Sequence, residues 1–151
     1  MTRSEIREIA MHVSFALGMN AGSSDELVCA LLDEDYYQTL VDECALYSEY
    51  PSKKQIAYLK QMAVGLCEHL IELDLYIEKY AKDWKVGRIS RVAVAIMRVA
   101  MYEILYVSDI DGGVSINEAV EMAKKYEEPD TVKFINGILG SFIRNELREE
   151  S

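Results

Sequence analysis

The sequence has few prolines, glycines and phenylalanines, and it lacks a long apolar run. Its 151 residues include only two prolines, eight glycines and three phenylalanines, whereas Ala, Leu, Ile, Met and Glu are abundant. Most of these abundant residues favour helices, so the composition predicts an all-α fold. No run of about 18 apolar residues is present, which argues against a membrane span. The first ten residues also lack the apolar core of a signal peptide.

Cysteine is scarce, and its spacing fits neither a disulfide framework nor a zinc site. Cys29, Cys44 and Cys67 are odd in number and lie far apart in the sequence. A disulfide-stapled domain needs an even and denser set, and a structural zinc site needs closely spaced ligands. We therefore expect reduced thiols in a cytoplasmic protein.

Basic residues are absent from a long segment near the N-terminus. Between residues 8 and 52 there is no Lys or Arg, against nine Asp and Glu, and the net charge of the whole chain is −10. Such a charge argues against nonspecific binding to polyanions. Basic residues gather instead between residues 82 and 98, namely Lys82, Lys85, Arg88, Arg91 and Arg98. Any contact with nucleic acid should therefore be confined to this basic segment and the two termini.

The apolar pattern predicts about seven helices in two packed helical sub-bundles, within a single domain over residues 1–151. Three helices should open with a capping box, in which two side chains satisfy free backbone N–H groups. These boxes pair Thr2 with Glu5, Ser23 with Glu26 and Ser52 with Gln55. The first of these helices is predicted to end at about residue 19. The second is predicted to end at about 47, with a break near 33–35, and the third at about 80, with a bend. A strongly apolar helix is expected over 89–107.

The stretch from Val114 to Leu139 reads VSINEAVEMAKKYEEPDTVKFINGIL and predicts two short helices joined at a proline. Ser115 is expected to cap the first helix and to form a further capping box with Glu118. That helix should stop before Pro129, because the residue before a proline is pushed out of the α region. Asp130 is expected to cap the second helix.

Side chains that could carry catalysis are sparse. His12 and His69 lie on different predicted helices, with no neighbouring Ser or Cys that suggests a triad. The acids at 33–35 could hold a divalent ion, but they lack the twelve-residue loop pattern of calcium sites. No glycine-rich phosphate loop follows a strand, because no strand is predicted. We therefore predict no catalytic residue, no metal site, no cofactor and no enzymatic activity.

Two motifs near the C-terminus carry a resemblance to a known family. They are INEAVE at 116–121 and KFINGIL at 133–139, and they follow Trp84 and the IMRVA segment at 96–100. Together, at this separation, they resemble the NusB family of transcription antitermination factors. The resemblance implies an all-helical RNA-binding domain that binds boxA RNA together with the ribosomal protein NusE. It also implies a place in the RNA polymerase elongation complex with other Nus factors, where read-through in ribosomal RNA operons is promoted, and it allows a homodimer.

The resemblance places one set of RNA contacts in the first helix. In NusB-like proteins, arginines at the start of this helix take part in binding boxA RNA, and the matching residues here are Arg3 and Arg7. An aromatic residue of the same helix is matched by Phe15. From composition alone, pairing of these arginines with neighbouring acids such as Glu5 or Glu8 is favoured over phosphate contact.

A second set of implied contacts lies toward the C-terminus. Relatives use the loop before the last helix and that helix's first turn, where Asp130, Lys133 and Phe134 match. A helix N-terminus offers free N–H groups to phosphate, and an aromatic ring can stack on an unpaired base. Tyr80 matches a tyrosine that relatives place near the RNA. Without the resemblance, plain core burial is favoured for Phe134.

Two other hypotheses remain open at this stage. One is a stand-alone relative of the helical RNA-binding domain that precedes RNA cytosine methyltransferases. The other is a protein-only helical scaffold, which the net charge and the few N-terminal arginines suggest.

Overall fold

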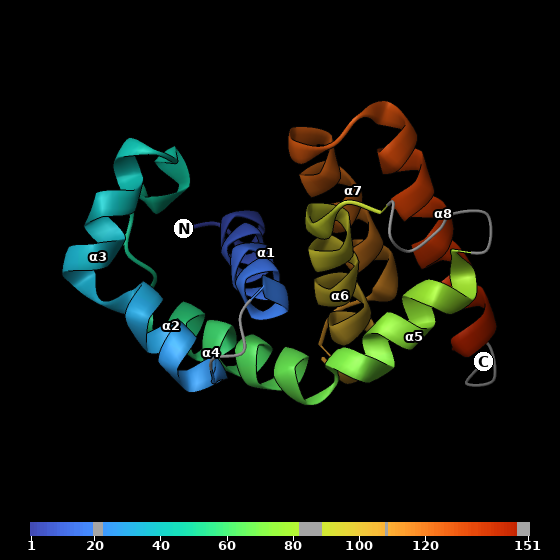
Figure 1. The fold of residues 1–151 in the computed structure, drawn as a ribbon, viewed down its shortest axis with the longest axis horizontal. Helices are drawn as coiled ribbons and strands as arrows, with labels where there is room; N and C mark the ends of the chain where they lie inside the picture. The colour runs from blue at the N-terminus through green and yellow to red at the C-terminus, as the bar shows by residue number, and fades with distance from the viewer. Residues whose placement is uncertain (20–22, 82–88, 108, 148–151) are drawn as a thin grey trace. The chain divides into compact units, whose positions relative to one another are not determined.

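The computed structural model describes residues 1–19, 23–81, 89–107 and 109–147 (Figure 1). In chain order the elements are α1 (Arg3–Met19), α2 (Ser24–Leu32), α3 (Glu34–Thr39), η1 (Leu40–Asp42), η2 (Ala45–Ser48), α4 (Lys53–Glu68), α5 (Leu70–Tyr80), α6 (Arg91–Tyr106), α7 (Gly112–Tyr126) and α8 (Pro129–Glu146), where η marks a 3-10 helix. These ranges contain helices and no strand, which confirms the predicted all-α class. Each described helix is too short or too polar to cross a bilayer. The chain divides into two compact units, residues 1–68 and 69–151.

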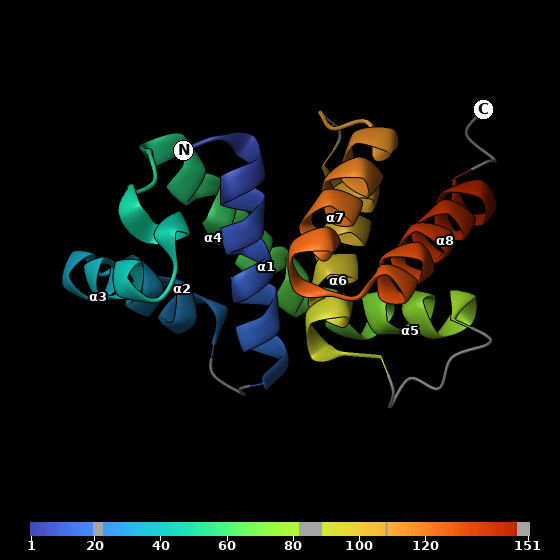
Figure 2. The same cartoon turned by 90° about the horizontal axis from the view of Figure 1, so that it is seen from above.

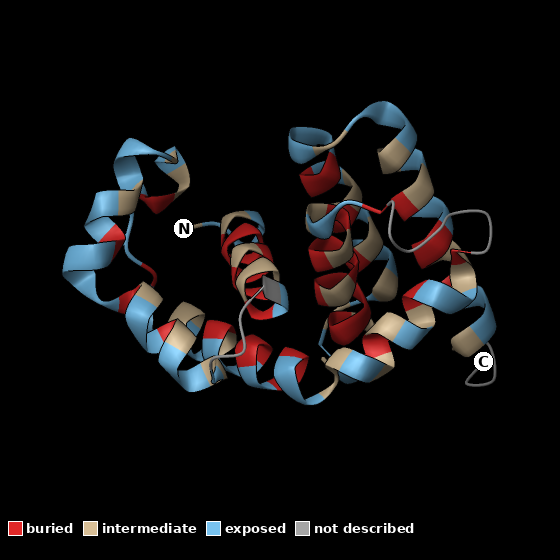
Figure 3. Ribbon diagram, viewed as in Figure 1, coloured by how far each residue is buried: buried red, intermediate tan, exposed pale blue. Residues whose placement is uncertain are grey.

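Unit 1, residues 1–68, is built on α4. This helix packs against α1 and α2, and α3 and the two 3-10 helices follow on from α2. Apolar residues at helical spacing form the buried face: Ile6, Ile9, Ala10, Val13 and Leu17 on α1, with Leu59, Met62, Ala63 and Leu66 on α4. Figure 3 shows the contrast between these helices and α3, which is exposed along most of its length. The core of unit 1 therefore lies along α1 and α4.

The predicted helix starts of unit 1 are confirmed. Thr2 and Glu5 exchange hydrogen bonds between side chain and backbone, and Ser52 and Gln55 do the same at α4. Ser23 accepts from the backbone N–H of Glu26 at the start of α2. The break expected near 33–35 is also present, where α2 ends and α3 begins at Asp33.

Unit 2, residues 69–151, is organised around α6. Its helix α6 packs against α5, α7 and α8, and α8 also contacts α5 and α7 (Figure 2). α6 is buried on most sides, as its apolar sequence predicts, and Ala93, Met97 and Met101 are fully enclosed. From α8 the core receives Ile135, Leu139 and Phe142, each 0% exposed.

The corner between α7 and α8 differs from the prediction in its caps. α7 begins four residues earlier than expected, at Gly112, and its N-cap is Asp111, whose carboxylate accepts from the Gly113 N–H at 3.0 Å. A Cβ at Gly112 would lie only 2.9 Å from Ile143 Cδ1, so glycine allows this close approach to α8. Ser115 is therefore a buried residue within the helix. At α8 the N-cap is Glu128, because Pro129 occupies the first helical position, where its fixed φ fits.

A polar pair, His12 and Tyr47, lies inside unit 1. The two rings stack at 5.7 Å, and the Tyr47 hydroxyl lies 2.5 Å from His12 Nδ1. Burial lowers the pKa of His12, although the nearby Glu8 carboxylate opposes this shift, and burial raises the pKa of Tyr47. Both groups are therefore neutral near pH 7, and we assign the Tyr47 hydroxyl as the donor to Nδ1.

The lowered pKa of His12 predicts a loss of stability in mild acid. Unfolded His titrates near pH 6.5, so below this pH the unfolded chain binds a proton more readily than the folded chain. The contribution of His12 is fully present above about pH 6.5 and is lost as pH falls through its folded pKa, by at most about 1.4 kcal/mol per pH unit. Urea unfolding at pH 7.5 and 5.5 measures this loss in the free energy of unfolding. The His12→Gln variant should lose less stability between these pH values than the unchanged protein, and equal losses would contradict the prediction.

Candidate RNA interface

The first predicted RNA-binding set lies on α1 in unit 1. Arg3 is the first residue of this helix and is exposed. Arg7, one turn further on, is only 6% exposed, and Phe15 is half-buried. Arg3 rather than Arg7 therefore presents its guanidinium to solvent.

Arg7 lies in a polar, buried stretch of α1. Its neighbour Glu8 is 7% exposed and Ser14 is 1% exposed, and all three residues have interaction partners. A charged group at such depth is tolerated only when its charge and hydrogen bonds are satisfied. Arg7 is thus buried with its interactions satisfied, and RNA contact at this position stays a prediction.

The second predicted set lies at the start of α8 in unit 2. Asp130 and Lys133 are exposed, and Phe134 is half-buried, so the structure brings these three side chains together within the first two turns of one helix. The backbone N–H groups of the first turn have no partner within the helix and carry the positive end of its dipole. Glu128 caps this end without a side-chain hydrogen bond. The geometry suits an anion beside an aromatic face, although Asp130 adds a negative charge.

Tyr80 lies at the opposite end of α8 from this set. It ends α5, and its hydroxyl is hydrogen-bonded to the carboxylate of Glu146, which Lys79 also contacts at 2.7 Å. The separation of Asp130 and Glu146 along α8 corresponds to about 24 Å. Within unit 2, therefore, the structure does not bring Tyr80 together with Lys133 and Phe134.

The hydrogen bond between Tyr80 and Glu146 joins a protonated phenol to a charged carboxylate. Hydrogen bonds from Lys79 and Tyr80 lower the pKa of Glu146, so its carboxylate stays charged at neutral pH. Burial, and then the hydrogen bond to Glu146, raise the pKa of Tyr80, so the phenol remains protonated and donates. The Tyr80 ring also packs edge-on against Phe142, with 6.3 Å between the ring centres.

The basic segment at 82–98 is described only in part. Arg98 is committed to Asp74, which it contacts through Nε at 2.8 Å and through Nη2 at 2.9 Å. Arg91 is exposed. The other members of the predicted segment, Lys82, Lys85 and Arg88, lie outside the described residues, as does Trp84.

The acidic cluster at 33–35 has a structural use. Asp33 accepts from the Tyr36 backbone N–H at 3.1 Å and so caps α3. Within the described parts of the chain, no three His, Cys, Asp or Glu side chains are grouped so that they could hold a metal ion.

Sequence reasoning missed a cavity in unit 1 that α1, α2, α3, η1 and η2 enclose together, with His12 and Tyr47 in its wall. The sequence shows only that His12 has no neighbouring Ser or Cys that suggests a triad. Its partner Tyr47 is 35 positions away, on a short 3-10 helix that the apolar pattern does not predict. No local signal in the sequence links these residues.

Comparison with known proteins identifies the family. The model of the NusB family matches residues 4–144. A transcription antitermination protein NusB from Ligilactobacillus salivarius is 36% identical over 144 residues, which cover 95% of this chain and 98% of the relative. The protein of the same name from Ruminiclostridium cellulolyticum is 35% identical over 151 residues, covering 100% of this chain and 94% of the relative.

A solved structure agrees with the sequence relatives. The structure of T. maritima NusB matches with a TM-score of 0.72 and 27% identity, and the match covers 99% of this chain and 96% of that one. The helical fold, the two C-terminal motifs and the match over nearly the whole chain lead to one conclusion: this protein belongs to the NusB family of transcription antitermination proteins.

Proposed function

We propose that this protein is a cytoplasmic antitermination factor that binds boxA RNA together with the ribosomal protein NusE. In this proposal residues 1–151 act as one RNA-binding domain, and the complex joins RNA polymerase and other Nus factors to promote read-through in ribosomal RNA operons. The observation that carries it is the family match over residues 4–144. The names of the relatives describe antitermination proteins, which supports a binding role without turnover.

The start of α8 gives the proposal a physical basis. Lys133 is exposed one turn after the start of α8, where the free N–H groups of Asp130 and Thr131 favour an anion, so a phosphate of the RNA would be attracted there. The half-buried ring of Phe134 has an edge or face left for an unpaired base. Arg3, exposed at the start of α1, would contact a phosphate in the same way.

The decisive experiment is a titration of boxA RNA in the presence and absence of NusE. If the RNA and NusE bind the same conformation of the protein, NusE should raise the affinity for RNA by about 5- to 150-fold, the usual range for coupled sites. An RNA of equal length with a scrambled boxA sequence is the control. Equal affinity in both arms, or no preference for boxA, would reject the proposal.

Lys133→Ala should weaken RNA binding mainly at low salt. Each phosphate contact on a single strand contributes about 0.7 to the slope of log affinity against log salt, because a bound cation releases a counterion. The variant should lose about this much slope, and Arg3→Ala should do the same. Fluorescence anisotropy at several salt concentrations measures the slope. Lys60→Ala, an exposed lysine on α4 outside the predicted set, should leave it unchanged.

The outcomes also separate the other hypotheses. Binding of NusE without any binding of RNA at low salt would select the protein-only scaffold. RNA binding that is indifferent to NusE would favour the relative of the methyltransferase domain. The mass in solution at the same concentrations tests the homodimer.

A further inference from the structure

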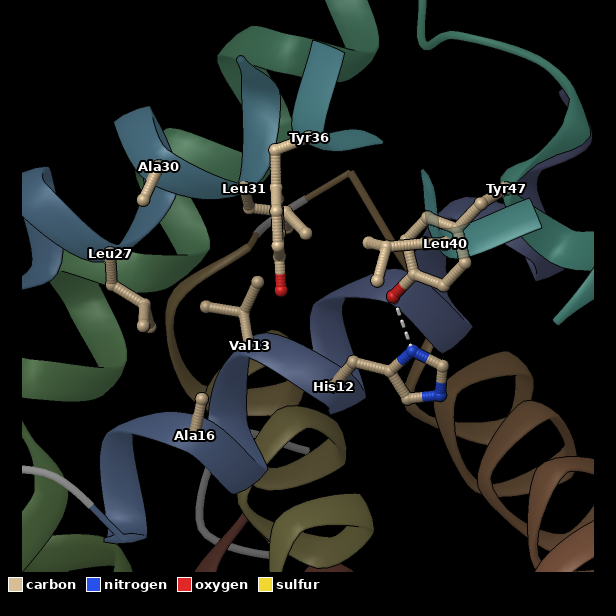
Figure 4. A pocket seen from close by; sticks show the side chains of 9 residues that line it. All are labelled: His12, Val13, Ala16, Leu27, Ala30, Leu31, Tyr36, Leu40 and Tyr47. Carbon is tan, nitrogen blue, oxygen red and sulfur yellow. Dashed lines mark hydrogen bonds between the residues drawn. The ribbon is translucent and has the colours of Figure 1, made fainter. Parts of the chain in front are cut away.

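Unit 1 contains a cavity of about 270 Å³ outside the residues assigned to RNA. Figure 4 shows its walls, with Val13 of α1 below, Leu27 of α2 to the left, and the side chain of Tyr36 reaching down from above toward Val13. The polar pair His12 and Tyr47 is satisfied internally by its own hydrogen bond. The wall is otherwise apolar or aromatic, so it suits an apolar group.

The size of this cavity selects the kind of occupant. Sites for small molecules and cofactors usually measure about 300–1,000 Å³, and this cavity lies just below that range. One large side chain or two smaller ones fit it better. Tyr36, which is 50% exposed, adds an aromatic surface at the mouth.

The acidic residues that neighbour the wall residues in sequence indicate which kind of protein segment would supply this side chain. Tyr36 directly follows the acids at 33–35, and Leu40, another wall residue, is followed by acids at 42 and 43. All five acids are exposed. Because no Lys or Arg occurs between residues 8 and 52, no basic residue of this segment offsets them. Exposed acids that neighbour the wall residues in sequence repel an anionic strand and attract a basic segment.

We propose that this cavity docks a basic protein segment, which inserts one large apolar side chain between α1, α2 and α3 while its Lys and Arg residues pair with the exposed acids at 33–35, 42 and 43. The apolar side chain supplies affinity and the charges supply orientation and a fast encounter. This inference does not rest on RNA binding, because the RNA residues proposed above do not line the cavity.

The test uses the full chain and a fluorescein-labelled amphipathic helical peptide made of lysine and leucine. Anisotropy should report binding that weakens as salt rises. Ala30→Trp places a large ring at the cavity wall and should weaken binding about tenfold, a typical loss for a blocked anchor pocket. Ala57→Trp, at an exposed alanine of α4, is the matched control and should bind as the unchanged protein does.

Two further arms separate docking from general attraction to an acidic protein. A peptide with serine in place of leucine keeps its charge and should bind at least about tenfold more weakly. The double variant Glu34→Gln with Asp35→Asn should lose affinity and salt dependence, unlike Glu68→Gln with Glu78→Gln, which removes equal charge elsewhere. Circular dichroism checks that each variant is folded, and the charge variants decide the matter if Ala30→Trp is not. Equal binding by both peptides, or by both charge variants, would overturn the inference.

Discussion

Phe142→Ala is expected to lower the free energy of unfolding by about 3–5 kcal/mol, the usual loss for a fully buried aromatic ring. Phe142 is 0% exposed in α8. Its ring meets Tyr76 edge-on at 5.0 Å and Tyr80 at 6.3 Å, so it joins α8 to α5. Truncation removes both aromatic contacts and leaves a cavity that two tyrosines cannot readily fill. Urea unfolding followed by circular dichroism measures the loss.

Two controls accompany this variant. Phe142→Leu keeps most of the apolar volume and should cost less than about 1.5 kcal/mol. Leu75→Ala truncates a residue of α5 that is 59% exposed and should change stability by less than about 0.5 kcal/mol. If Phe142→Ala lowered the free energy of unfolding no more than Leu75→Ala does, the described packing of α8 on α5 would be contradicted.

Tyr37→Ala should destabilise the protein by a similar amount, about 3–5 kcal/mol. Tyr37 is 1% exposed, and its ring meets Tyr47 and Tyr50 edge-on, each at 5.1 Å. Burial raises its pKa to about 12, so its hydroxyl stays protonated and donates to the Glu49 carbonyl at 2.8 Å. One side chain therefore holds α3 against the segment that leads into α4.

Tyr37→Phe separates the ring from the hydroxyl. Because the ring remains, this variant should lose only the hydrogen bond, about 1 kcal/mol. Tyr36→Ala, at the neighbouring half-exposed tyrosine, should cost less than about 1 kcal/mol. Midpoints of thermal or urea unfolding rank the three variants, and a loss for Tyr37→Phe as large as for Tyr37→Ala would show that the aromatic packing contributes little.

Local signals in the sequence were sufficient for most of the fold. The helix starts at Thr2, Ser23 and Ser52 depend on residues only three positions apart, so the sequence predicts them directly. The start of α7 was predicted at the wrong residue. The expected cap was Ser115, whereas Asp111, four residues earlier, caps the helix through the Gly113 N–H. Gly112 fits this first turn because it has no Cβ to meet Ile143 of α8, a contact that no local pattern encodes.

The predicted site residues also divide into those whose exposure the local sequence predicts and those whose position it does not predict. Exposure at Arg3 and Lys133 agrees with their position at helix starts. The burial of Arg7 and the attachment of Tyr80 to Glu146 depend on residues from elsewhere in the fold, and a motif match between sequences cannot reveal them. The cavity around His12 is lined by residues from five elements, and no motif with a fixed spacing in the sequence predicts it.

The carboxylate of Glu146 has a consequence for how a nucleic acid strand would travel over unit 2. Hydrogen bonds from Lys79 and Tyr80 lower the pKa of this group and fix it in place, so it is charged at neutral pH. Lys79 places its ammonium group 2.7 Å from this carboxylate, so the two charges offset each other at this end of α8. A phosphate beside Tyr80 would therefore meet a closed ion pair, and Tyr80 could turn its hydroxyl to a strand of RNA only after its hydrogen bond to Glu146 opens.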